Sequence, residues 1–306
     1  MDISALIEKL ALLFFTMLVG FFAAKCGILN RETNQTLSSI IVNITNPLQI
    51  LASVMTGERL LSNLQVLELT VVNAVCYVLM IVLGLVFVKV LRVPSREATA
   101  CRLLLLLSNV GFLGYPLAEA LLGESAKFCV TIFVLSFHLV CWTYGVYLVE
   151  GTGKFRFSWK ILLRPCVVCA LLAYAIYFTG LRFPAAVGQA ANYVGDLTGR
   201  LAMVVVGVSL AQLSFRTVFG NWRIYVLCAL KLVVLPLLFW AALRGVLKDP
   251  LMLSTGTLSL CMPAATSVTI LCYQYGQDET IASSGVFLST LLCIVTIPLM
   301  MTLLFT

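Results

Sequence analysis

The stretch LSNVGFLGYP at residues 107–116 and the stretch SLCMPAATS at residues 259–267 each lie near the middle of a long apolar run. Both carry residues that disfavour a regular helix, because proline lacks an N–H and glycine tolerates unwound backbone. Hydrocarbon offers no water to a freed backbone group, so such interruptions survive only against protein or beside a wet cavity. A matching pair in the two halves of a chain is typical of the binding site of a secondary transporter.

The composition indicates an all-α membrane protein. The chain has 306 residues, of which 61% are hydrophobic and 11% are charged, and its mean hydropathy is +1.05. Soluble domains carry about 25% charged residues. The net charge of +7 is therefore not read as a nucleic-acid signal, and no nucleic-acid partner is expected. No cleavable signal peptide is expected either, because the first apolar run is too long and lacks a basic segment before it.

No metal or other cofactor is expected from the cysteine and histidine pattern. Eleven cysteines are scattered through apolar runs, and Cys166 and Cys169 form the only C-x-x-C pair. His138 is the only histidine. Zinc, haem and disulfide frameworks need more ligands or pairs than this.

Ten apolar runs are visible, and most reach the roughly 20 residues that a membrane-spanning helix requires. They lie near residues 3–24, 36–56, 65–90, 98–122, 127–149, 160–179, 184–213, 222–246, 251–275 and 280–305. The sequence therefore predicts ten transmembrane helices and no soluble domain.

Lysine and arginine predict the orientation, since loops on the cytoplasmic side carry an excess of both. With the N-terminus outside, the inward loops hold Lys25, Arg31, Lys89, Arg92, Arg96, Arg102, Lys154, Arg156, Lys160, Arg164, Arg216 and Arg223. The outward ends hold Lys9, Arg59, Lys127, Arg182, Arg244 and Lys248. This two-to-one bias favours both termini outside. Ten helices divide into five and five, residues 1–150 and 157–306, and an odd number per half makes the second half an inverted copy of the first.

Polar and helix-breaking residues coincide at the depth of the bilayer centre, about ten residues from either end of a spanning helix. In helices 2, 4 and 9 they are Asn46, Asn109, Gly111, Gly114, Pro116 and Pro263. The freed half-helix ends would present N–H groups and a positive dipole to a carboxylate, and asparagine amides can donate to its oxygens. Plain proline kinks and interhelical hydrogen bonds are the alternatives.

Three ionisable residues are candidates for charge or proton handling. Asp196 and Arg200 stand four residues apart on one helical face, either as a structural pair or with Arg200 attracting an anion that Asp196 holds or releases. Asp196 and His138 are the candidates for proton coupling. Lys231 is expected to snorkel to the cytoplasmic face, because it lies only about two turns into helix 8.

The segment Ser108-Asn109-x-Gly111-Phe112-Leu113-Gly114-x-Pro116-Leu117 resembles the helix 4 signature of the auxin efflux carrier family. Stretches at 201–211, 262–265 and 282–298 resemble its helices 7, 9 and 10. The resemblance implies a fold similar to the sodium/bile-acid symporters, with helices 4 and 9 crossing at their breaks. It also implies a scaffold domain of helices 1, 2, 6 and 7, a transport domain of helices 3–5 and 8–10, and a homodimer.

The same resemblance extends the site and suggests a branch. Its crossover maps onto 109–116 and 263–267, which adds Ala264, Thr266 and Ser267 to the candidate substrate-binding residues. Plant members have a long loop after helix 5, whereas the short loop here suggests a bacterial carrier in the inner membrane. Members often have a proline where this chain has Arg200, which motivates the hypothesis that Arg200 supplies the cation for a mono- or dicarboxylate.

A secondary transporter of a small organic anion, working by alternating access, is the leading interpretation. A membrane sensor or channel on the same fold, or a cation-coupled bile-acid-type symporter, is the alternative. An enzyme is not expected, because HExxH and a paired-acid motif are lacking and Gly195-Asp196 alone is weak. Coupling to sodium, to protons or to neither stays open, as do substrate and direction.

Overall fold

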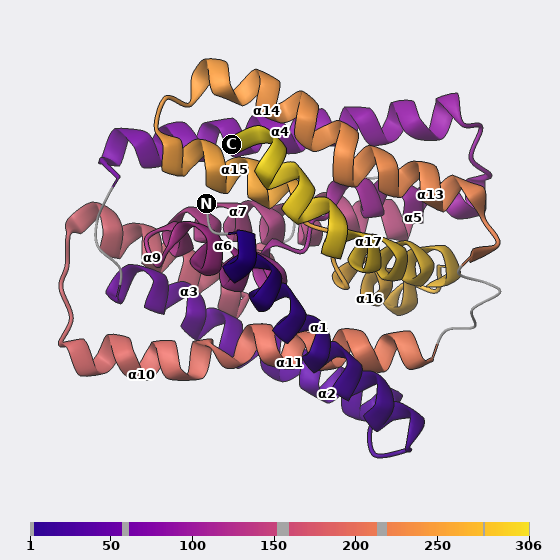
Figure 1. Ribbon diagram of the computed structural model, residues 1–306, viewed down its shortest axis with the longest axis horizontal. Helices are drawn as coiled ribbons and strands as arrows, with labels where there is room; N and C mark the ends of the chain where they lie inside the picture. The colour runs from indigo at the N-terminus through magenta and orange to yellow at the C-terminus, as the bar shows by residue number, and fades with distance from the viewer. Residues whose placement is uncertain (1–2, 57–60, 152–158, 213–218, 278, 306) are drawn as a thin grey trace.

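The computed structural model describes residues 3–56, 61–151, 159–212, 219–277 and 279–305, and its regular structure there is helical (Figure 1). The α-helices are α1 (Ile3–Lys25), α2 (Arg31–Ile40), α3 (Asn46–Met55), α4 (Asn63–Val90), α5 (Ser95–Leu106), α6 (Tyr115–Leu122), α7 (Ala126–Val140), α8 (Val146–Glu150), α9 (Pro165–Thr179), α10 (Ala185–Gly195), α11 (Leu197–Ala211), α13 (Trp222–Ala229), α14 (Leu235–Val246), α15 (Pro250–Cys261), α16 (Ser267–Gln274) and α17 (Glu279–Phe305). A 3₁₀ turn, η4 (Trp159–Leu163), precedes α9.

The apolar runs predicted from the sequence coincide with helical segments throughout the described residues. Six of these segments are long and apolar enough to cross a bilayer: Arg31–Met55, Asn63–Val90, Ala126–Glu150, Ala185–Ala211, Trp222–Val246 and Thr280–Phe305. Four shorter apolar helices lie at Phe14–Lys25, Val110–Leu122, Pro165–Thr179 and Pro250–Cys261. The protein is therefore a multi-pass membrane protein. Ten crossings, the inverted repeat and the orientation stay predictions, and several of the counted cations (Arg59, Lys154, Arg156, Arg216 and the Lys9 side chain) lie outside the described residues.

Single π-helical turns interrupt four of the segments, and three of these turns precede a proline. They are η1 (Ile41–Thr45), η2 (Val110–Gly114), η3 (Cys141–Gly145) and η5 (Leu230–Val234). Pro47, Pro116 and Pro236 lie in the first two positions of the α-helix that follows η1, η2 and η5. Proline removes one N–H and its ring pushes away the carbonyl four residues earlier, so the preceding turn widens.

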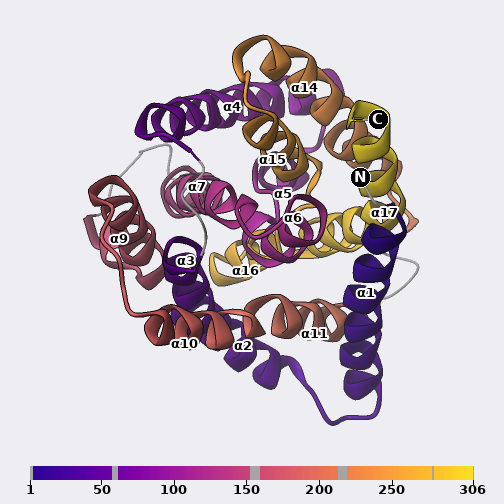
Figure 2. The same ribbon diagram turned by 60° about the vertical axis from the view of Figure 1, so that its left-hand side comes forward.

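The helices pack in two groups around the interrupted segments. One group joins α1 to α11 and places α3 between α9 and α10. In the other, α4, α14 and α17 surround α5 and α15, as the view in Figure 2 shows. Leu67, Val71 and Val78 of α4 are exposed, which is typical of a helix that faces lipid. The division into scaffold and transport domains stays a prediction, because it concerns motion.

Glycines let α1 and α11 approach backbone to backbone. A Cβ at Gly207 would collide with the carbonyl of Met17, and one at Gly20 would collide with the backbone of Val204. Small residues at such contacts are how helices pack in a membrane, where lipid removes the hydrophobic drive for side chains to associate. The contact therefore depends on the absence of side chains at residues 20 and 207.

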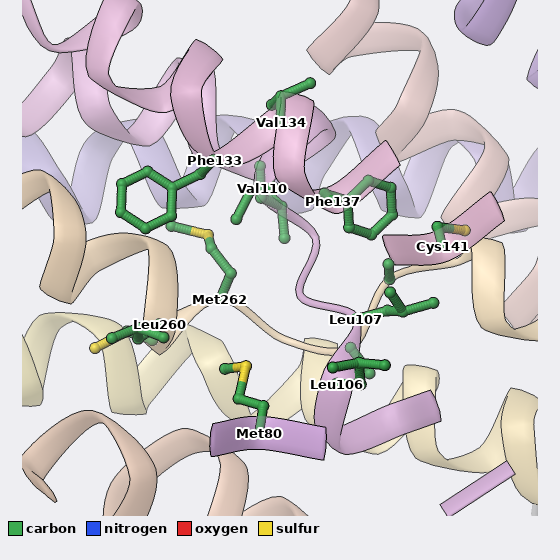
Figure 3. Close-up of a cluster of buried hydrophobic side chains, with 14 of the residues drawn as sticks. Met80, Leu106, Leu107, Val110, Phe133, Val134, Phe137, Cys141, Leu260 and Met262 are labelled. Carbon is green, nitrogen blue, oxygen red and sulfur yellow. The ribbon is translucent and has the colours of Figure 1, made fainter. Parts of the chain in front are cut away.

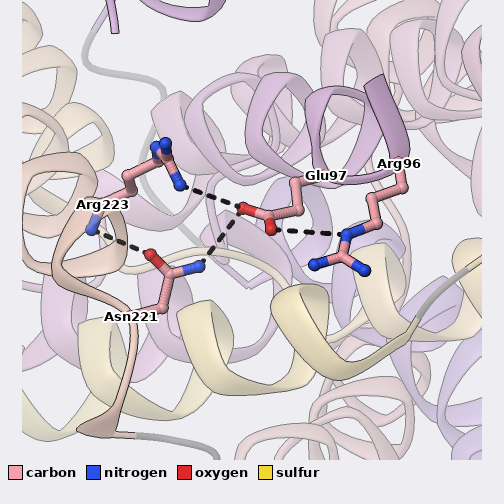
Figure 4. A network of polar contacts seen from close by, with 4 residues as sticks. All are labelled: Arg96, Glu97, Asn221 and Arg223. Atoms are coloured by element: carbon pink, nitrogen blue, oxygen red, sulfur yellow. Dashed lines mark hydrogen bonds and ion pairs between the residues drawn. The ribbon is translucent and has the colours of Figure 1, made fainter. Parts of the chain in front are cut away.

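A polar network joins the start of α5 to the start of α13 (Figure 4). The Glu97 carboxylate, 8% exposed, lies 3.7 Å from Nε of Arg96 and 4.0 Å from a terminal nitrogen of Arg223. It also accepts a 3.2 Å hydrogen bond from the amide of Asn221, whose own oxygen accepts from the backbone N–H of Arg223 at 3.0 Å. A buried carboxylate needs such partners, so Glu97 fixes where α13 begins relative to α5.

We expect Gly207→Ala to destabilise the protein by about 1–3 kcal/mol, because the added methyl group forces the backbones of α1 and α11 apart. The measurement is the melting temperature of the purified protein in detergent.

Gly245→Ala is the matched control, because Gly245 is an exposed helical glycine whose added methyl group would meet nothing within 4 Å. Alanine favours a helix by roughly 1 kcal/mol over glycine, so this variant should be as stable as the parent or slightly more so. Equal melting temperatures for the two variants would contradict the backbone contact.

Candidate functional site

The two interrupted helices meet where both have unwound. α5 ends at Leu106, α15 ends at Cys261, and the segments between them and the next helices run antiparallel. Ser108 and Ala264 form an isolated antiparallel β-bridge. The N–H of Asn109 donates to the carbonyl of Pro263 at 2.8 Å, and the N–H of Ala265 donates to the carbonyl of Leu107 at 2.9 Å. The predicted crossing of two broken helices is therefore present.

Apolar side chains enclose this crossing. Figure 3 shows Leu107 and Met262 on the two crossing segments, with Met80, Val110 and Phe133 around them. All five side chains are buried, with 4% exposure or less. The crossing is consequently sealed from lipid by protein, as an unwound backbone at membrane depth requires.

The break in the first segment lies earlier than the proline and glycines suggest. Leu107 is extended, with φ −94° and ψ 103°, whereas Gly111 and Gly114 belong to the π-helical turn η2 and Pro116 lies inside α6. Pro116 widens the turn before it but leaves α6 helical. The chain opens instead at residues 107–109, where the second segment supplies hydrogen-bond partners.

Protein groups pair several of the backbone groups freed at the crossing. Besides the two interstrand bonds, the N–H of Ala264 donates to Oγ of Ser289 on α17 at 3.1 Å. The carbonyl of Leu105, in the last turn of α5, accepts from Nζ of Lys231 at 2.9 Å. The N–H groups of Asn109, Ala264 and Ala265 are thus already paired and do not face a ligand.

Lys231 does not snorkel, and that prediction was wrong. Its side chain is 1% exposed, and its ammonium donates to Oγ of Ser108 at 3.0 Å in addition to the Leu105 carbonyl. The π turn η5, which precedes Pro236, carries it inward. Both acceptors lie at the end of α5, where the helix dipole favours a cation.

Two buried asparagines lie beside the crossing with unpaired amide atoms. Asn46 is 2% exposed and Asn109 is 4% exposed. Oδ1 of Asn46 and Nδ2 of Asn109 have no hydrogen-bond partner among the described residues. Nδ2 of Asn46 lies 3.4 Å from where a Cβ on Gly111 would be, so the glycine leaves space for this amide. Unpaired buried amides are costly, and they are where a water or a ligand would bind.

A cavity of about 810 Å³ lies next to the crossing, between α2 and α11 on one side and α16 and α17 on the other. Its lining residues are Arg31, Asn34, Gln35, Ser38, Ser39, Val42, Asn43, Trp142, Arg164, Val205, Val206, Ser209, Leu210, Gln212, Thr266, Ser267, Thr269, Ile270, Thr280, Ser283, Val286 and Phe287. It extends from exposed Arg31 to Thr266, which is 8% exposed. The size suits a small molecule.

The lining of this cavity is positive and polar. Among the described residues that line it, Arg31 and Arg164 are the charged side chains, and none is an aspartate or glutamate. The guanidinium of Arg164 stacks over the ring of Trp142, 3.5 Å from its centroid. Such stacking orients the guanidinium, whose planar donors match a carboxylate. The arrangement can therefore bind an organic anion.

The structure brings only some of the predicted site residues together. Thr266 and Ser267 line the cavity, while Ala264, Pro263 and Asn109 lie buried in the crossing itself.

The second half of the interrupted segment faces other helices. Gly114 packs on Val130, and Pro116 packs on α11, where it lies 3.3 Å from the Cβ position of Gly199. These residues shape the contact with α7 and α11 and do not line the cavity.

The charged candidates lie elsewhere. Arg200 is exposed and does not line the cavity. Asp196 accepts a 3.4 Å hydrogen bond from Asn192, and among the described residues no ion pair joins Asp196 to Arg200. His138 is 6% exposed and meets Phe137 edge to face, with ring centroids 5.3 Å apart.

Sequence reasoning missed Arg164, Trp142, Lys231 and Ser289 as parts of the site. Arg164 was counted only as a loop cation, although its position directly before Pro165 marks the start of a helix. Periodicity gives no signal for Ser289, because the serines and threonines of α17 do not gather on one face of this mainly apolar helix.

The comparisons with known proteins agree with a transporter. The family described as membrane transport protein matches residues 5–156 and 154–301. An uncharacterised transporter of Methanocaldococcus jannaschii is 25% identical over 92% of this chain and 94% of its own length. The uncharacterised transporter YfdV of Escherichia coli is 21% identical over 92% of both chains. A Rhizobium meliloti protein named "Putative malonate transporter" is 25% identical over 62% of both chains.

We expect Ser289→Ala to destabilise the protein by about 1–3 kcal/mol, because it leaves the buried N–H of Ala264 without an acceptor. Thermal unfolding in detergent measures this.

Ser136→Ala is the control, since the hydrogen bond of the Ser136 hydroxyl within the described part of the chain goes to a carbonyl of its own helix, at 3.4 Å. If both alanine variants unfold at the parental temperature, Ser289 does not support the crossing.

Proposed function

Because the chain belongs to the membrane transport protein family, the family of the auxin efflux carriers, we propose that it is a secondary transporter that moves a small organic anion by alternating access. The observation that carries the proposal is the cavity beside the crossing, whose described lining combines two arginines with hydroxyl and amide side chains and includes no carboxylate. The Arg164 guanidinium would attract an anion there, the charge of Arg31 would add to the positive potential, and none of the described lining residues carries a like charge.

The substrate class follows from the size and charge of this site. A cavity of about 810 Å³ exceeds the volume of a small carboxylate, so waters would accompany the ligand. Thr266 and Ser267 at the start of α16 place hydroxyl donors near the positive end of that helix. The malonate named for the Rhizobium relative is a molecule of this class. Mono- and dicarboxylates are therefore the substrates to test.

Alternating access would need the cavity wall formed by α2 and α11 to move relative to the wall formed by α16 and α17. The proposal includes ten transmembrane crossings in an inverted repeat, both termini outside and a homodimer in the cell membrane. With that orientation the cavity opens to the cytoplasm, because Arg31 lies at the end of an inward loop. Transport could be coupled to sodium or to protons, with Asp196 or His138 as the proton-binding residue, and the uptake experiment below tests both.

The experiment is uptake of radiolabelled mono- and dicarboxylates into proteoliposomes, with sodium, pH and voltage gradients imposed separately. Saturable uptake of at least one carboxylate, competed by its congeners, is the expected result. A current that flows without any substrate would indicate a channel and contradict the proposal.

We expect Arg164→Ala to raise the KM for the transported anion about 10- to 100-fold, because a hydrogen bond to a charged group contributes about 1.5–3 kcal/mol. Arg164→Lys keeps the charge but not the planar fork, and should fall between Ala and the parent.

Arg200→Ala is the comparison variant, and it also tests the hypothesis that the helix 7 arginine binds the anion. From its exposed position outside the cavity we expect it to leave KM unchanged. An unchanged KM for Arg164→Ala, or a large increase for Arg200→Ala, would move the anion site away from the cavity.

A further inference from the structure

Lys231 is a buried cation that the proposed substrate cavity does not use. It belongs to the π turn η5 and does not line the large cavity. Its ammonium contacts the carbonyl oxygen of Leu105 at 2.9 Å and Oγ of Ser108 at 3.0 Å. Both oxygens belong to the end of α5 and the break that follows, so the charge lies directly at the crossing.

The end of α5 attracts a cation for a simple electrostatic reason. The last carbonyls of a helix lack N–H partners, and the helix dipole adds partial negative charge there. In secondary transporters with broken helices, such C-terminal ends and unwound carbonyls are where a coupling cation is coordinated. In this chain an ammonium group of the protein occupies that position.

No carboxylate neutralises this ammonium among the described residues. The ion pairs of the described residues centre on Glu97 and Lys127 and do not include Lys231. A buried charge without a counter-ion is strongly unfavourable unless dipoles and hydrogen bonds stabilise it. The Leu105 carbonyl, the Ser108 hydroxyl and the end of α5 are the groups that do so.

Ser108 also borders a small cavity with other oxygen-bearing side chains, although Lys231 is not part of its lining. This cavity of about 10 Å³, the size of one water, is lined by Ser108 together with Asn73 and Ser259. Shortening Lys231 would enlarge the space beside the Leu105 carbonyl and Ser108. Oxygen atoms that now accept from the ammonium would then be free to coordinate a small cation.

We propose that the Lys231 ammonium takes the place of a coupling metal ion at the C-terminal end of α5. The crossing then has a positive charge at this position without binding a metal ion. The inference rests on the proposed carrier function and specifies its coupling. Lys231 is a positioning residue, because it acts on the backbone of the break and does not touch the proposed substrate cavity. A carrier built in this way has no use for sodium at this position.

The experiment measures melting temperatures of the purified protein without substrate, so its failure leaves the transport assay to judge the proposed function separately. The parent protein should melt at the same temperature in sodium chloride and in choline chloride of equal ionic strength. Lys231→Ala should melt lower, and methylammonium chloride or sodium chloride should restore at least half of the loss. Tetramethylammonium chloride, whose cation donates no hydrogen bond, should restore none.

Leu232→Ala is the matched control, because Leu232 is also 1% exposed and its truncation leaves an apolar cavity on the same turn. It should melt lower with no recovery in either cation. Lys231→Met, which keeps the side-chain length but removes the hydrogen-bond donors, should also melt below the parent. It provides a second test of the proposal if Lys231→Ala does not fold.

Any one of three results would overturn the inference. The first is a parent protein that sodium stabilises relative to choline. The second is a Lys231→Met variant as stable as the parent. The third is a Lys231→Ala variant that recovers no more than Leu232→Ala does.

Discussion

The fold depends on satisfying backbone hydrogen bonds inside a bilayer that supplies none. Two helices stop at Leu106 and Cys261, and each one provides the partners that the other has lost. Neither interruption would be stable alone, since residues 107–109 and 263–265 bond to one another rather than to water. Ser289, Lys231 and the surrounding apolar side chains complete this arrangement, because each pairs or shields a group that the crossing leaves free.

Much of the helical organisation is predictable, because span length and hydropathy are local properties of the chain. The runs near 65–90 and 280–305, for example, reappear as α4 and α17. The exact point of interruption is not local. Proline and glycine indicate weakness around 111–116, yet the chain opens at 107–109, where the other segment offers acceptors and donors. A single sequence therefore indicates which helix is interrupted, but not where along it the second segment makes its hydrogen bonds.

For the site, the sequence predicts how deep in the membrane a residue lies, but not which way its side chain faces. Asn46, Asn109, Thr266 and Ser267 lie at or beside the crossing, as their positions in the middle of apolar runs suggest. Facing direction is harder, because each π turn adds a residue and rotates the rest of the helix. Lys231, in such a turn, points inward, whereas Arg200 points away from the cavity. Neither direction follows from hydrophobic periodicity, since α11 and the segment around η5 are largely apolar.

The glycine contact between α1 and α11 restricts which parts of the molecule can slide. A contact between two backbones cannot be relieved by a change of side-chain rotamer. If α1 moved by one residue along α11, a side chain would take the place of a glycine and clash with the opposite main chain. We therefore expect α1 and α11 to move together and not to slide past each other. Across the large cavity, by contrast, α2 faces α16 and α17 over open space. If the protein works by the proposed alternating access, we therefore expect the helices to move relative to one another across this cavity and not between α1 and α11.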